Sequence, residues 1–178
     1  WLQTFLKRFE GVIAVSAETA AGCIARGVPE AKVSTVLNAC DTKWRDEKDP
    51  EFTSWLQTEH GVDCDTHFVI MSAGRPVPRK GFSWFATKVM PELPDNVVYV
   101  VVGPVSGAPA AMRFLQKFLP SALLQSLSHA VGAQSDYIRL RDASDRPNLK
   151  GRVVIAGPMT REPLNQMYLH SSVFVMPN

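Results

Sequence analysis

The run Val97-Val-Tyr-Val-Val-Val102 constrains the fold most, because six successive apolar residues predict a strand that is buried on both faces. Strands of this kind are typical of a parallel sheet covered by helices on both sides. Shorter strand patterns at 67–72, 152–156 and 173–176 are separated from it by helical patterns, notably 82–93 and 161–170. Alternating strands and helices with short loops predict an α/β fold, a doubly wound parallel sheet with right-handed crossovers.

A shorter α/β series precedes this sheet. Its patterns predict helices at 1–10 and 17–26 and strands at 12–15 and 33–37, with Gly27 ending the second helix. The polar turn Asn38-Ala-Cys-Asp41 follows the second strand.

A charged and weakly patterned stretch, residues 42–65, separates the two series, and only a piece near 52–59 is amphipathic. We therefore predict the end of one domain over 1–41, a linker over 42–65, and the first part of a second domain over 66–178.

The loop between the strand at 67–72 and the helix at 82–93 carries Arg75 and Lys80. Two cations at a strand-to-helix turn suggest a diphosphate, because a helix N-terminus offers unpaired N–H groups and a glycine lets an anion approach the backbone. The loop is not a Walker P-loop, since Gly81 stands where a Ser or Thr would hold magnesium. The alternative is that both cations are solvated on an ordinary loop.

Between Gly103 and Arg152 the patterns predict one or two helices within 109–131, broken at Pro120, and then an Arg/Asp-rich loop that runs to Lys150. Basic and acidic residues alternate there. We interpret this segment as a solvated loop, with an anionic membrane surface as the alternative partner. The basic residues are Arg139, Arg141, Arg146, Lys150 and Arg152, and the acidic ones are Asp136, Asp142 and Asp145.

The composition excludes disordered and fibrous proteins. A chain of 178 residues that is 46% hydrophobic can bury a core, and a net charge of +2 does not favour nucleic acid as a partner. Cys23, Cys40 and Cys64 show no C-x-x-C spacing, which argues against a disulfide framework or a structural zinc site and fits a reducing, cytoplasmic setting. No histidine pair has metal-ligand spacing, so no metal is predicted.

Five motifs follow one another along the chain: Val12-Ile-Ala-Val-Ser16, Leu37-Asn-Ala-Cys-Asp41, Gly74-Arg-x4-Lys-Gly81, Val100-Val-Val-Gly103 and Val154-Ile-Ala-Gly157. They occur in the order seen in retaining glycosyltransferases, and the chain resembles family 4 of the GT-B fold over nearly its whole length. The resemblance implies two Rossmann-like domains, with this chain containing the end of the N-terminal one and the first half of the donor-binding one.

The resemblance also implies the activity, which is transfer of a hexose from a UDP, GDP or ADP sugar to a hydroxyl of a carbohydrate, lipid or small molecule. Arg75 and Lys80 would hold the donor diphosphate and neutralise the departing nucleotide, with no metal and no cofactor. Donor-binding positions implied in the same way are Gly74, Gly103 and Pro104 beside the donor, Gly157, Pro158 and Met159 at the nucleobase, and Leu164 nearby.

The chain departs from the family pattern in three places. The turn at 37–41 has Leu37 in place of the usual proline and Ala39-Cys40 in place of Gly-Val, so its backbone can differ. The segment 104–151 is longer than usual, which suggests an insertion near 135–150. The family's paired glutamates would follow Asn178, so the chain reads as an excerpt without them.

Two rival functions remain open at this point. One is another GT-B enzyme, such as a sugar-nucleotide epimerase, which uses acidic and histidine residues in its cleft. The other is a glycosyltransferase-like module that binds nucleotide or protein without catalysis.

Overall fold

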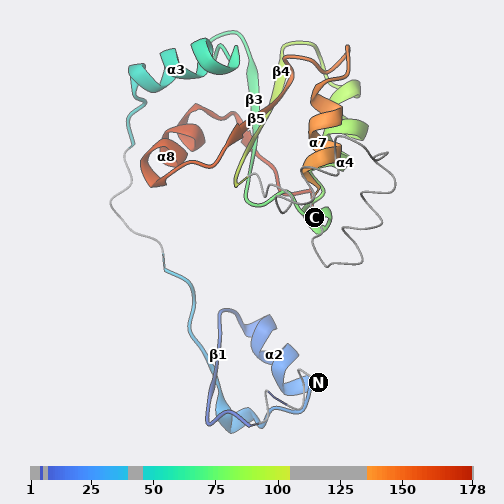
Figure 1. The fold of residues 1–178 in the computed structure, drawn as a ribbon. Coiled ribbons are helices and arrows are strands. Elements are labelled where there is room, and N and C mark those ends of the chain that lie inside the picture. The colour runs from blue at the N-terminus through green and yellow to red at the C-terminus, as the bar shows by residue number, and fades with distance from the viewer. Residues whose placement is uncertain (1–4, 6–7, 40–45, 105–135, 178) are drawn as a thin grey trace, which may run out of the picture. The chain divides into compact units, whose positions relative to one another are not determined.

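The computed structural model describes residues 5, 8–39, 46–104 and 136–177. The chain forms two compact units that divide between residues 44 and 45. Each unit has its own parallel sheet and its own helices (Figure 1).

The first unit is a small βαβ element. β1 (Val12–Ala14) pairs in parallel with β2 (Val33–Thr35), and α2 (Ala17–Ala25) and the short η1 (Glu30–Lys32) lie between them in the chain. The Ser16 hydroxyl caps α2 by accepting from the Thr19 N–H at 3.0 Å. The helix and both strands agree with the prediction, although each strand is shorter. The helix predicted over 1–10 falls mostly outside the described residues, and 8–10 form a turn and a bend.

The second unit contains the predicted parallel sheet of four strands in the order β5-β4-β3-β6 (Figure 1). All six residues of β4 are buried, as its unbroken apolar run predicts. Every pairing in this sheet is parallel. The strands are β3 (Phe68–Ala73), β4 (Val97–Val102), β5 (Val153–Gly157) and β6 (Val173–Phe174).

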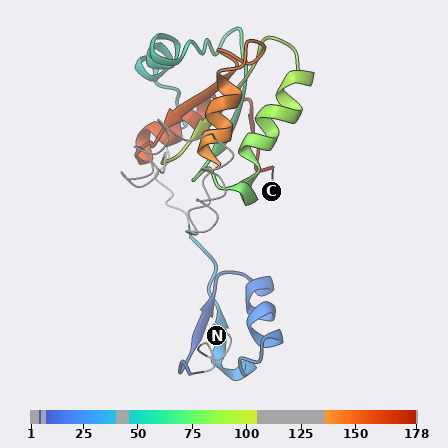
Figure 2. The same cartoon turned by 45° about the vertical axis from the view of Figure 1, so that its right-hand side comes forward.

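Helices cover both faces of this sheet, and each covering layer closes one hydrophobic core (Figure 2). One core centres on Tyr99 and Phe82 and the other on Met71 and Met167. The doubly wound arrangement is therefore confirmed. The first layer consists of α4 (Phe82–Trp84), η3 (Phe85–Val89), η4 (Met90–Glu92) and α7 (Tyr137–Ser144), and the second of α3 (Pro50–His60) and α8 (Arg161–His170).

The helical segment predicted over 82–93 is present but is not uniform. It begins as α4, continues as the π-helical η3 and ends as the 3-10 turn η4. Pro91 lies at the start of η4 and has no N–H to continue the regular ladder, so the hydrogen-bond spacing changes there.

The stretch predicted as a linker contains α3, which is part of the second unit. Phe52 and Leu56, one turn apart, are buried in its core. Asp49 begins the helix by accepting from the Glu51 N–H at 2.9 Å, and Gly61 ends it in the left-handed conformation. Its many charged residues lie outside the narrow apolar face, which is why the pattern resembled a linker.

The solvated loop predicted before Arg152 is wrong in its first half. Residues 137–144 form α7, and Leu140, Ala143 and Leu149 are fully buried against the sheet. Their spacing of three and six residues was masked by the surrounding charges. The helices predicted within 109–131 lie outside the described residues.

Candidate functional site

Three of the predicted glycines lie side by side at the carboxyl ends of adjacent strands. Gly74 follows β3 and donates its N–H to the Val102 carbonyl oxygen at 2.8 Å. Gly103 follows β4 and donates its N–H to the Gly157 carbonyl oxygen at 2.9 Å. In doubly wound sheets this edge is where ligands bind.

Two of these positions require glycine, Gly103 because its backbone is packed against the Gly74 backbone, and Gly74 because of its backbone conformation. A Cβ on Gly103 would lie 2.0 Å from the Gly74 carbonyl oxygen. A Cβ on Gly74 would lie 2.0 Å from the Lys80 Nζ, and Gly74 has a φ of +130°. The Lys80 ammonium therefore lies in close contact with the Gly74 backbone, in the space that a side chain at Gly74 would fill.

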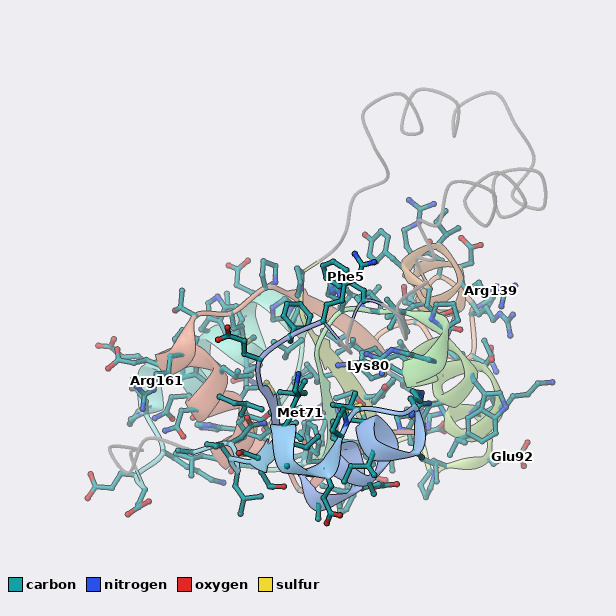
Figure 3. The ribbon with its side chains drawn as sticks, turned by 90° about the horizontal axis from the view of Figure 1, so that it is seen from below. Phe5, Met71, Lys80, Glu92, Arg139 and Arg161 are labelled. Carbon is teal, nitrogen blue, oxygen red and sulfur yellow. The ribbon has the colours of Figure 1, made fainter. Side chains whose placement is uncertain are left out.

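Lys80 ends the short turn η2 (Pro78–Lys80) and is half-buried. Its ammonium donates to the Ala73 carbonyl oxygen at 3.4 Å and lies 5.7 Å from the centre of the Phe82 ring. An ammonium has three N–H donors, and the described part of the chain supplies one long hydrogen bond. In Figure 3, Lys80 lies toward the middle of the view and Arg139 at its margin. The remaining donors of Lys80 suit an anion at this edge.

Arg75 is exposed and directly follows Gly74 in the same loop. Within the described ranges its guanidinium takes part in no hydrogen bond or ion pair. A guanidinium carries five N–H donors in a planar fork that matches a phosphate group. The structure thus brings two cations with unused donors into the loop that follows β3.

The same loop is anchored by Asp136, which is 2% exposed. Its Oδ2 accepts from the Ser83 N–H at 2.9 Å and its Oδ1 accepts from the Ser83 hydroxyl at 2.7 Å. Its own N–H donates to the Pro76 carbonyl oxygen at 2.8 Å. The prediction that Asp136 lies in a solvated loop is therefore wrong. The Ser83 N–H is bonded to Asp136, so it is not one of the unpaired N–H groups predicted at this helix start.

A second buried polar group is the Tyr99 hydroxyl on β4. The Tyr99 hydroxyl donates to the Ser72 Oγ at 2.8 Å, and Ser72 donates to the Val175 carbonyl oxygen at 2.5 Å. Burial raises the pKa of Tyr99 above its usual range, the Ser72 hydrogen bond opposes this, and the Asp136 charge adds to it. These bonds join β4, β3 and the segment after β6.

The other predicted donor-binding residues lie at or near the same edge. Pro104 and Pro158 are exposed beside Gly103 and Gly157. Met159 and Leu164 are half-buried and pack against the core below α8. Their side chains thus contribute to packing, and the backbone of the 157–159 turn is what remains available to a ligand.

The predicted basic cluster is not one surface. Arg152 lies at the amino end of β5, where its guanidinium donates to the Leu93 and Pro94 carbonyl oxygens at 2.8 and 2.7 Å. It also pairs with Asp95 at 3.2 Å. Arg152 is therefore a structural residue, contrary to the solvated role predicted for it.

The histidines on and beside α3 have local roles. His170 on α8 is joined to α3 by a hydrogen bond of 2.8 Å between its Nε2 and the Thr53 Oγ1. His60 packs edge-on against Trp55, and burial lowers the pKa of His60 although nearby Glu59 opposes this. Across the described ranges, no group of three or more His, Cys, Asp or Glu could hold a metal ion, and no helix is long and apolar enough to cross a membrane.

An open groove beside the start of α3 is separate from this site. Its lining is mainly acidic, which does not suit a phosphate. The residues are Asp46, Glu47, Lys48, Asp49, Pro50, Glu51 and Gln166.

Comparison with known proteins finds similarity in structure. Alr3699/HepE from Anabaena, solved with UDP, aligns at a TM-score of 0.63 and 21% identity over 99% of this chain and 42% of its own. The same protein solved with UDP-glucose aligns at a TM-score of 0.62 and 20% identity, over 98% of this chain and 42% of its own. Sucrose-phosphate synthase from Thermosynechococcus elongatus aligns at a TM-score of 0.57 and 19% identity, over 99% of this chain and 37% of its own. No protein-family model and no curated protein matches the sequence.

These structures confirm the predicted Rossmann-like α/β fold of the GT-B type. The chain spans about two fifths of the length of these neighbours. At such low identity the similarity establishes the fold alone.

Proposed function

We propose that this chain is part of a glycosyltransferase that moves a hexose from a nucleoside-diphosphate sugar to a hydroxyl acceptor with retention of configuration and without a metal. The proposal rests on Arg75 and Lys80, two cations that keep unused donors within the described ranges and lie beside Gly74 and Gly103 at the carboxyl edge. The structural neighbours solved with UDP and UDP-glucose support it.

The proposed chemistry follows from where the cations lie. The Arg75 fork and the Lys80 ammonium bind the diphosphate oxygens, and the open backbone at Gly157 faces the nucleoside. When the bond between the sugar C1 and the phosphate oxygen breaks, the electron pair stays on that oxygen. The two cations stabilise the developing negative charge, while the acceptor oxygen forms the new bond to C1 and its proton passes to the departing diphosphate.

The acceptor is a carbohydrate, a lipid or a small molecule with a free hydroxyl, and the setting is the cytoplasm or the surface of a membrane. The acceptor follows from the family resemblance, whereas the cytoplasm follows from the cysteine spacing and the membrane surface from the basic residues before and at Arg152. Flotation of the complete natural protein with anionic vesicles separates the membrane surface from free solution.

The test uses the complete natural protein with UDP, GDP and ADP sugars. Isothermal titration identifies the bound nucleotide, and NMR of the product reports the anomeric configuration. Arg75→Ala is expected to weaken nucleotide binding and lower turnover by about 100-fold. Arg79→Ala is the matched control, because Arg79 is an exposed arginine in the same loop.

Equal activity in Arg75→Ala, Arg79→Ala and the natural protein would contradict the proposed diphosphate site. An epimerised donor without transfer would identify the chain with the epimerase alternative. Nucleotide binding without any turnover would identify a binding module.

A further inference from the structure

Asp136 is a buried carboxylate that joins two parts of the second unit 53 residues apart in sequence. Its side chain binds the Ser83 N–H and hydroxyl at the start of α4, and its N–H binds the Pro76 carbonyl oxygen. Pro76 and Ser83 are the two ends of the segment that contains Lys80. One residue thus holds both ends of the cationic loop, which we define as residues 76–83.

We propose that Asp136 is a positioning residue that holds the cationic loop, and with it Lys80, in the geometry that binds a diphosphate. This inference rests on the proposed function. It assigns to Asp136 no contact with the substrate, since its oxygens are bonded to Ser83.

The local structure shows that this carboxylate serves the loop and not its own helix. Asp136 is the N-cap residue of α7, where an Asp usually accepts from its own first turn, yet it makes no such bond. The N-cap residue of α4 is Gly81, which has no side chain to cap the helix. Asp136 therefore caps α4 from another element, which fixes the start of α4 relative to α7.

The loop transmits this anchoring to Lys80 because it is short and internally bonded. The Lys80 N–H donates to the Val77 carbonyl oxygen at 2.9 Å, and the Gly81 N–H donates to the Pro78 carbonyl oxygen at 3.1 Å. Phe82 is fully buried, and the Lys80 ammonium lies beside its ring. A shift of Ser83 would therefore move Lys80, while the ammonium itself stays free of the Asp136 carboxylate.

Gly81 shows how little room the loop has to move. A Cβ at Gly81 would lie 2.5 Å from the Pro177 carbonyl oxygen, so the segment after β6 packs directly against the loop. The same segment is held to β3, because the Ser72 hydroxyl donates to Val175. The loop is thus enclosed by the Pro177 segment and held at both ends by Asp136.

The experiment compares Asp136→Ala and Asp136→Asn in the complete natural protein. In Asp136→Asn the amide oxygen can accept from the Ser83 N–H while the amide NH2 donates to the Ser83 hydroxyl, so both bonds persist without the charge. UDP affinity and the KM for the sugar nucleotide are expected to weaken about 10- to 100-fold in Asp136→Ala. In Asp136→Asn they are expected to stay within about threefold.

Ser83→Ala tests the anchor from its other side. It removes the hydroxyl bond and keeps the N–H bond, so an intermediate loss of about three- to tenfold is expected. Amide hydrogen exchange gives a readout without any ligand, and the Gly81 and Ser83 amides are expected to exchange at least about tenfold faster in Asp136→Ala.

Thr53→Val is the matched control for lost stability. It breaks the hydrogen bond to His170 between α3 and α8, away from the loop. It is expected to lower the melting temperature without changing UDP affinity. If Asp136→Ala and Thr53→Val weaken UDP binding equally, or Asp136→Asn behaves as Asp136→Ala, the positioning role is overturned. If the natural protein itself does not bind UDP or another nucleotide, the proposed function fails first and the inference with it.

Discussion

Cations lie at both the amino and the carboxyl ends of the strands in the main sheet, but they differ in how many hydrogen bonds they make to the protein. At the amino edge the Arg152 guanidinium binds three carbonyl oxygens through Nη2 at 2.7–3.2 Å and pairs with Asp95. At the carboxyl edge the Lys80 ammonium has one bond of 3.4 Å, and Arg75 has none among the described residues.

Unused donors, more than charge, distinguish a cation that can bind a ligand from one that stabilises the fold. A guanidinium that donates to several carbonyl oxygens and a carboxylate of the protein stabilises the fold and has little donor capacity left for a ligand. A cation that keeps donors next to a closely packed glycine backbone can bind an anion at little cost in reorganisation. The sequence shows the same kind of residue in both places.

The largest expected effect comes from the carboxyl edge. Lys80→Ala is expected to lower kcat/KM by about 100- to 1000-fold, because charge developing on the departing diphosphate loses a preorganised donor. The melting temperature should change by less than about 2 °C, since the lost bond is long. Steady-state kinetics measures kcat/KM, and a thermal melt measures the melting temperature. Unfolding of the variant would show that Lys80 stabilises the fold, as Arg152 does.

The next effect comes from the amino edge. Arg152→Met keeps the aliphatic stem but removes every bond to the carbonyl oxygens, and we expect it to destabilise the protein by about 2–3 kcal/mol. Chemical denaturation measures this loss. Nucleotide affinity at low denaturant should match that of the natural protein, and weakened binding at full folding would contradict the separation of the two edges.

The smallest effect concerns Tyr99, in the strand between the edges. Its pKa is higher in the folded than in the unfolded protein, where it is about 10, so its contribution to stability is present below pH 10 and is lost as the pH rises above it. Tyr99→Phe should cost about 1 kcal/mol at neutral pH through the lost Ser72 bond. The gap between the natural protein and Tyr99→Phe should shrink above pH 10 in denaturation curves. A constant gap would show that Tyr99 keeps its usual pKa.

The sequence predicted the sheet well because its signal is local. The bounds of Val97–Val102 and Arg161–His170 are the same in prediction and structure. Runs of apolar residues and their spacing reflect burial, which acts on every residue of an element. The position of Arg75 and Lys80 in the loop after β3 follows from the same local pattern.

The failures have a different physical origin. The prediction places α3 in a linker because its apolar face is narrow, and only packing within the second unit shows that Phe52 and Leu56 are buried. The solvated positions predicted for Asp136 and Arg152 follow from the charged residues that surround them in sequence. Their partners Ser83 and Pro94 lie 53 and 58 residues away, beyond any local pattern.

Local sequence patterns establish the α/β alternation, the parallel strands and the position of two cations at a strand-to-helix turn. Only the assembled sheet shows which cations are held by hydrogen bonds to the protein, which carboxylate anchors the loop and which glycines contact one another. The reason is that burial of an apolar run depends on local composition, whereas a hydrogen bond between distant residues forms only when the assembled sheet brings donor and acceptor together.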